Sequence, residues 1–210
     1  MKTFQMLLRK ALVCLALIPA TSQAITLSIN PVTQTVDPGT PVQVDLVIAG
    51  LGNHTAPSLG AFDLDLSFNA GLLAFTGLTF GGALGDELAG EAFVSFSTGA
   101  GTVNLFEVSL LEPSATGCIF CLAPYLDDLQ ADSFVLATLD FTTLGIGTSA
   151  LGISINALSD GYGDPLTTNV QTGRVTVGAV ATVPAPSPLL LMAIGFLGFG
   201  IRKAMGHVAA

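Results

Sequence analysis

Two cysteines form the sharpest local signal in this sequence. Cys118 and Cys121 are separated by two residues and flanked by Gly117 and Pro124, which places them in a connection between ordered elements. Two cysteines at this spacing close a small loop when they are oxidised outside the cytoplasm. We therefore predict a Cys118–Cys121 disulfide. The alternatives are weaker, because a redox centre needs a neighbouring helix in a βαβ unit and zinc needs two further ligands.

A second candidate is the acidic, glycine-rich segment from residue 160 to residue 164 (DGYGD), which carries two carboxylates four residues apart. Asp160 and Asp164, together with free backbone carbonyls, would supply the hard oxygen ligands that Ca²⁺ requires. No glutamate closes a twelve-residue calcium loop here, and we favour a solvated turn in which aspartate caps its own backbone. Calcium stays open as the metal for Asp160 and Asp164, and no other cofactor is expected.

A third candidate is the pair Asp63 and Asp65, which alternates with Leu64 and Leu66. Two carboxylates can flank a glycosidic bond in polysaccharide hydrolysis. The alternation with leucine indicates more simply the wet face of a β-sheet. Because the stretch 25–180 has one histidine and no lysine, few side chains remain for acid–base or nucleophilic chemistry. We therefore predict that the protein is not an enzyme.

The composition bounds the class of protein that holds these residues. Half of the residues are hydrophobic and a tenth are charged, so the chain can bury enough apolar surface to fold. All fifteen acidic residues lie between Asp37 and Asp164, and Arg174 is the only lysine or arginine of the stretch 25–180. Fifteen acids against this one arginine leave the middle of the chain with a net charge of about −14. Such a surface repels nucleic acid, so no nucleic-acid partner is expected.

The N-terminal segment, residues 1 to 24, has the pattern of an export signal. Basic residues precede an apolar run, Pro19 ends that run, and small residues follow up to Ala24. We expect signal cleavage after Ala24 and a mature protein that begins at Ile25. The protein is therefore predicted to be exported.

The C-terminal segment is predicted to engage the membrane. Leu189 to Ile201 is almost wholly apolar, and Arg202 and Lys203 follow at once, which marks a cytoplasmic side. A helix of this length spans roughly 20 Å, less than the hydrocarbon core of about 30 Å. We therefore expect a short transmembrane helix that anchors a precursor in the inner membrane.

This tail resembles the PEP-CTERM sorting signal of Gram-negative exopolysaccharide producers. The resemblance covers residues 183 to 205 and rests on a proline-rich motif, the apolar run and the terminal basic pair. The residues at the motif positions are Val183, Pro184, Ala185, Pro186, Ser187, Arg202 and Lys203. Ala185 stands where the family motif has glutamate. The resemblance implies processing by an exosortase, a membrane transpeptidase-like protease, and delivery to the cell surface or extracellular matrix.

Between the two ends, the dominant hydrophobic period is two, which is typical of β-strands. Turn sequences such as Asp37-Pro38-Gly39 and the TGAG of residues 98–101 separate the strands. Single helical turns are expected within 82–91 and 124–130. The sequence predicts an all-β, antiparallel β-sandwich of about nine strands. The nine candidates are Ile25 to Pro31, Val42 to Ala49, Ala61 to Phe68, Leu72 to Phe80, Phe93 to Phe96, Val103 to Leu110, Phe134 to Phe141, Leu151 to Ala157 and Arg174 to Val177.

The order of these strands resembles the cohesin-like β-sandwich, a nine-stranded jelly roll, over residues 25–180. The opening segment ITLSINPVTQTVDPGTPVQVDLVIAGL, the middle segment LGAFDLDLSFNAGLLAFTG and the closing segment GRVTV carry the resemblance. Cohesins bind dockerin modules through one sheet face, so the resemblance implies a protein partner. We expect an exported, non-enzymatic surface or matrix protein associated with exopolysaccharide. The alternative is a protein- or carbohydrate-binding module held at the membrane, and a polysaccharide-active enzyme is the third hypothesis.

Overall fold

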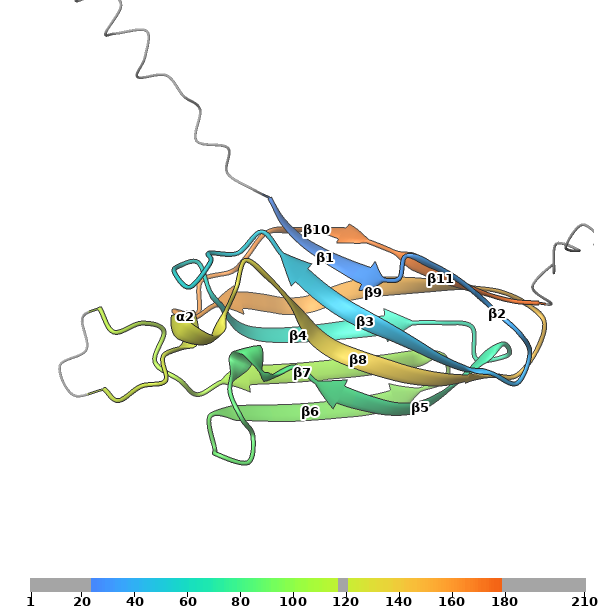
Figure 1. The fold of residues 1–210 in the computed structure, drawn as a ribbon, viewed down its shortest axis with the longest axis horizontal. Helices are drawn as coiled ribbons and strands as arrows, with labels where there is room; N and C mark the ends of the chain where they lie inside the picture. Colours follow the sequence, from blue (N-terminus) through green and yellow to red (C-terminus); the bar gives the residue numbers. More distant parts are fainter. Residues whose placement is uncertain (1–23, 117–120, 179–210) are drawn as a thin grey trace, which may run out of the picture. The chain divides into compact units, whose positions relative to one another are not determined.

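The computed structural model describes residues 24–116 and 121–178, which form an all-β domain (Figure 1). The predicted signal peptide up to residue 23, the sorting tail 183–205 and Cys118 lie outside these ranges. Within the described ranges, no helix has the length and apolar character needed to cross a bilayer. The predicted single helical turns are present as η1 (Gly82–Leu84) and α2 (Leu126–Leu129).

Eleven described strands form two sheets. The five-stranded sheet has the order β10 (Thr168–Gln171), β1 (Ile25–Asn30), β3 (Pro41–Ala49), β8 (Ser133–Thr143) and β5 (Leu73–Phe80). The six-stranded sheet has the order β2 (Thr33–Val36), β11 (Gly173–Val177), β9 (Gly147–Asp160), β4 (Leu59–Ser67), β7 (Thr102–Ser109) and β6 (Ala92–Gly99). The predicted β-sandwich is confirmed, and each of the nine expected strands has a counterpart in it.

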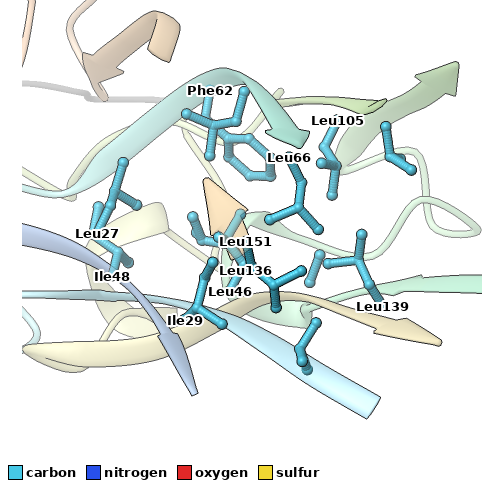
Figure 2. Close-up of a cluster of buried hydrophobic side chains, with 14 of the residues drawn as sticks. Leu27, Ile29, Leu46, Ile48, Phe62, Leu66, Leu105, Leu136, Leu139 and Leu151 are labelled. Atoms are coloured by element: carbon cyan, nitrogen blue, oxygen red, sulfur yellow. The ribbon is translucent and has the colours of Figure 1, made fainter. Parts of the chain in front are cut away.

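The core lies between the two sheets because each long strand turns every second side chain inward. In β4, Phe62, Leu64 and Leu66 are buried, while the residues between them face the opposite way. Figure 2 shows Phe62, Leu66 and Leu105 of one sheet facing Leu46 and other side chains of the second sheet. This single apolar layer holds the sandwich together and leaves one outer face on each sheet.

β2 and β10 are the two additional strands, which the hydrophobic pattern of the sequence does not predict. Each has four residues, and most of their side chains are exposed or half-buried, so neither shows an apolar alternation. β2 pairs with β11 and β10 pairs with β1, both in parallel. Both sheets are therefore mixed, with antiparallel pairing between all the other neighbours. Tertiary pairing, rather than local sequence, makes these two segments strands.

Two predicted turns depend on glycine. Gly39 has φ +83° in the turn after β2, and the N–H of Thr40 donates to the carbonyl of Asp37 over 3.3 Å. Gly101 has φ +80° in the β6–β7 hairpin, where a Cβ would lie 2.7 Å from the carbonyl oxygen of Phe68. Only glycine adopts these conformations at low cost, so the expected hairpin is confirmed together with its physical reason.

Gln130, directly after α2, completes the hydrogen bonding at the start of β4. The register of β4 with β7 begins at Ala61, which leaves the backbone of Leu59 beyond the end of that ladder. Gln130 Oε1 accepts the N–H of Leu59 over 2.6 Å, and its Nε2 donates to the Leu59 carbonyl over 2.8 Å. The same Nε2 donates to the carbonyl of Ala83 in η1 over 3.2 Å. Gln130, only 1% exposed, thus substitutes for a neighbouring strand.

Replacing Gln130 with leucine should destabilise the domain by about 2–4 kcal/mol, because two or three buried backbone groups lose their partners. Urea unfolding followed by circular dichroism measures this change. Gln43→Leu is the matched control, since Gln43 is exposed and donates to Asp140 on the surface; its cost should stay within about 0.5 kcal/mol. Equal midpoints for the two variants would show that Gln130 has no such role.

Candidate functional site

The outer face of the six-stranded sheet carries a cluster of polar side chains at its centre. Asp63 and Asp65 lie on β4, in the middle of this sheet, and point away from the core. Both are half-buried because side chains of the neighbouring strands pack beside them. The structure therefore confirms the prediction that these aspartates form the outward face of a strand that also contributes to the core.

Two asparagines from the strands on either side of β4 join the aspartates. Asn104 of β7 stands opposite Asp65, and its Nδ2 donates to Asp63 Oδ1 over 2.6 Å and to Asp65 Oδ1 over 2.9 Å. Asn156 of β9 donates from Nδ2 to Asp63 Oδ1 and to Asp65 Oδ2, each over 3.1 Å. The four side chains, which we call the Asp–Asn cluster, form one network across three strands.

A β-bulge in β9 brings Asn156 into this cluster. Asp63 pairs with Ala157 and the next residue of β4, Leu64, pairs with Ile155, so Asn156 is an extra residue. A bulge re-aims the side chain of its extra residue relative to the regular alternation. Asn156 can therefore reach both carboxylates, which lie on the outer side of β4.

An aromatic patch adjoins the Asp–Asn cluster. Phe106 of β7 stands opposite Asp63, and its ring centroid lies 6.2 Å from that of Phe93 on the edge strand β6. Phe93 is 55% exposed. The outer face thus combines ordered acceptors with an exposed aromatic side chain.

The network sets what the Asp–Asn cluster can do chemically. Each carboxylate accepts from two amide donors, so both aspartates are held in fixed positions by neutral partners. Charge-assisted hydrogen bonds of this kind orient acceptors without neutralising them. No lysine or arginine belongs to this network. The cluster therefore presents preordered negative charge to donors supplied from outside the chain.

The predicted calcium ligands, Asp160 at the end of β9 and Asp164 in the turn that follows, lie at a different place from the Asp–Asn cluster. Asp160 Oδ1 accepts the backbone N–H groups of Tyr162 and Asp164, each over 2.9 Å. The favoured interpretation of a self-capping turn therefore agrees with the geometry. Among the described residues, no group of three or more His, Cys, Asp or Glu side chains is placed to hold a metal ion. Calcium at Asp160 and Asp164 stays a prediction.

The predicted disulfide falls at the edge of the described chain. Cys121 is disulfide-bonded, and Tyr125 donates its hydroxyl to the Cys121 carbonyl over 3.0 Å. Cys118 lies outside the described residues, so the pairing of Cys118 with Cys121 stays a prediction.

Sequence reasoning did not find Asn104 or Asn156. Strand alternation gave a usable signal for Asn104, which lies between the apolar residues Val103 and Leu105 and must therefore point outward. It gave no signal for Asn156, because the bulge that aims this side chain follows from the pairing of β9 with β4. The carboxylates and Asn104 could be found from sequence, and Asn156 could not.

Comparison with known proteins assigns this architecture to a fold. No protein-family model matches the chain, and no curated protein has a similar sequence. Solved cohesin structures are similar to it. The seventh ScaB type I cohesin from Pseudobacteroides cellulosolvens has a TM-score of 0.57 at 15% identity, over 78% of this chain and 97% of that chain.

Two further cohesins agree with this result. The Coh-OlpA-Doc918 type I cohesin–dockerin complex from Clostridium thermocellum gives a TM-score of 0.56 at 13% identity, over 74% of this chain and 99% of that chain. The non-cellulosomal cohesin from the archaeon Archaeoglobus fulgidus gives a TM-score of 0.52 at 13% identity, over 74% of this chain and 92% of that chain. The domain therefore has the cohesin-like β-sandwich fold that the strand order resembles.

The role of the turn at Asp160 is open to a direct test. Asp160→Ala should lower the free energy of unfolding by about 1–2 kcal/mol because two backbone N–H groups lose their acceptor. Asp160→Asn keeps that acceptor and should be close to neutral, as should Asp164→Asn. Thermal melts with chelator measure these differences.

The same variants, melted in calcium, test the metal hypothesis. A bound Ca²⁺ at a hundredfold excess over Kd would raise the stability of the native chain by about 2.7 kcal/mol. Both asparagine variants would lose that gain, since each removes a charged ligand. Identical melting curves with calcium and with chelator would eliminate calcium at this turn.

Proposed function

We propose that this chain is an exported binding module that engages a protein partner through the outer face of its six-stranded sheet. The observation that carries the proposal is the Asp–Asn cluster beside the exposed ring of Phe93. The cohesin in one of the similar structures is seen in a complex with a dockerin. That partner class is extended to this chain as part of the proposal.

The composition of the two outer faces supports the choice of sheet. In the five-stranded sheet, Phe75, Phe80, Phe134 and Phe141 all pack against the core. The outward residues of its central strands include Asp45, which accepts from Thr138. Among the described strands, the exposed ring of Phe93 near ordered carboxylates therefore distinguishes the six-stranded face. Aromatic anchors next to ordered polar groups are the usual source of binding energy at protein interfaces.

Charge defines the chemistry of the partner. The excess of acid over base in residues 25–180 produces a negative potential that speeds the approach of a positively charged surface. The Asp–Asn cluster can then accept hydrogen bonds from lysine, arginine or backbone N–H donors of that surface. We therefore propose a partner whose contact surface is basic.

The binding face can be tested by photo-crosslinking in the cells that produce the protein. A photo-crosslinking amino acid at Ser97, which lies on β6 across from Asn104, should yield one defined protein adduct. The same amino acid at Thr79, on the other sheet, should not. Adducts from both positions in equal yield would contradict a single binding face.

Charge reversal within the cluster measures its contribution to affinity. With the crosslinked partner purified, Asp63→Lys should weaken binding at least tenfold, because it removes two ordered hydrogen bonds and repels a basic surface. Asp140→Lys on the other sheet is the matched control and should change affinity less than threefold. Isothermal titration calorimetry gives both constants. Equal losses for the two variants would place the contact elsewhere.

Localisation is the second part of the proposal. We infer that the signal peptide exports the chain and that the PEP-CTERM-like tail holds a precursor in the inner membrane until an exosortase releases it. The basis is the pairing of an export signal with a proline-rich motif, an apolar run and Arg202-Lys203. The released protein would lie at the cell surface or in the exopolysaccharide matrix.

The intact mass of the protein from an exosortase-bearing host tests this route. We expect loss of residues 1–24 and a second cut between Pro184 and Ser187, with the product in the surface or medium fraction. Deleting residues 189–203 should abolish the second cut, since it removes the membrane segment. A mature protein that retains its tail in the membrane fraction would contradict processing and leave an anchored binding module.

A further inference from the structure

A cleft of about 980 Å³ opens between β5 and β6, the strands at one edge of the two sheets. Its walls come from β5, β6, β7, α2 and the loop of residues 81–91 that follows β5. Asp63 and Asp65 do not line it, so it is separate from the Asp–Asn cluster. The sandwich is open here, because the apolar layer between the sheets ends before this edge closes.

Glu107 lies at the inner wall of the cleft. It follows the inward alternation of β7 after Val103 and Leu105, positions that hold apolar core residues. Its side chain is only 1% exposed, and among the described residues its Oε2 has no hydrogen-bond partner. A buried acceptor left unpaired is costly, so a donor brought by a ligand would be favoured at this position.

Three further acidic residues line the cleft, and two of them accept hydrogen bonds from the backbone of the loop. Glu91 Oε2 accepts the N–H of Asp86 over 3.0 Å, and Asp86 Oδ1 accepts the N–H of Leu88 over 2.8 Å. These bonds shape the loop. Glu87 makes no such side-chain bond with the residues that the structure describes, and it lines the cleft together with Glu107. No lysine, arginine or histidine is among the lining residues.

Apolar side chains form the remainder of the walls. Phe80, which packs against the core, and half-buried Val94 line the cleft, while Phe96 is 53% exposed at its wall. Leu88 in the loop is 96% exposed. Two carboxylates surrounded by such surfaces match a ligand that has a positive end and an apolar body.

We propose that this cleft binds an organic cation, an ammonium or guanidinium group on an apolar stem, with the charged group between Glu107 and Glu87 and the stem against Phe96. The described acidic residues are not arranged to hold a metal ion, which favours an organic cation over Ca²⁺. The cation is either a free amine or guanidine, or a lysine or arginine side chain of a bound protein. The inference does not depend on the proposed function, because it concerns a different surface.

The protonation of Glu107 adds a pH dependence. Burial, and then the charge of Glu87, raises the pKa of Glu107 from 4.5 to about 8. Asp86 and Glu91 are the other charged groups of the cleft, and both add negative charge. At neutral pH the Glu107 carboxyl is therefore largely protonated, and a cation that pairs with the carboxylate must displace its proton. Affinity should rise with pH.

The experiment titrates the purified protein with n-hexylguanidinium, whose charge is constant across the pH range. Affinity should increase by roughly 90-fold from about pH 6 to about pH 9, the ratio of ionised fractions for a pKa of about 8. A second arm uses a short peptide with one arginine between leucines. Stronger binding of the peptide assigns a protein side chain as the ligand, and stronger binding of the free guanidinium assigns a small cation.

Matched control variants decide whether Glu107 binds the cation and causes the pH dependence of its affinity. Glu107→Gln should weaken binding of both probes at least tenfold at high pH and remove the pH dependence, whereas Glu112→Gln, outside the cleft, should change neither. Neutral n-hexylurea should not bind. Equal binding to the native chain and Glu107→Gln, binding of the urea, or no binding of either cation would overturn the proposal.

Thermal melts without ligand test the burial of the Glu107 carboxyl. The native Glu107 carboxyl keeps its proton up to about pH 8, whereas the same group in the unfolded chain loses its proton near pH 4.5. The free energy of unfolding of the native chain therefore falls as the pH rises from about 4.5 to about 8. The melting temperature of Glu107→Gln relative to the native chain should therefore rise from about pH 5 to about pH 8 and level off above it. A constant difference would overturn the assignment.

Discussion

The alternation of side chains along β4 is the constraint on which both the core and the candidate site depend. Phe62, Leu64 and Leu66 point inward and are fully buried, so the register of β4 against its neighbours is strongly specified. A slip of one residue would expose three large apolar side chains and bury Asp63 and Asp65. The apolar layer therefore positions the two aspartates as firmly as it positions the core.

Where the alternation is interrupted, the interruption has a structural consequence. The bulge in β9 adds Asn156 to a face that regular pairing would leave without it, and the aspartates gain a second amide donor. At the start of β4, where the ladder with β7 ends, the side chain of Gln130 satisfies Leu59 in place of a strand. Both devices make hydrogen bonds that the sheet itself does not provide.

These features show how far the sequence alone can predict this structure. Period-two patterns located the nine longer strand regions and the outward direction of Asp63 and Asp65, because burial on one face imposes that pattern. The segments that became β2 and β10 carry no such pattern, since each is mostly exposed and is defined by its parallel partner. The position of Asn156 likewise depends on strand pairing, which local sequence does not encode.

Glu107 is an exception to the alternation of β7, because it places an acidic side chain at an inward position. In the sequence its segment reads as an ordinary strand, and only the tertiary structure shows that this position lies at the open edge between β5 and β6. There the apolar layer ends, so the carboxyl group meets a cleft rather than a packed core. An inward charge would be costly at Leu105, two residues earlier, where the packing is complete. The same strand thus contributes Asn104 to the outer face of the sheet and Glu107 to the cleft between β5 and β6. What each side chain can bind depends on the surface to which it belongs.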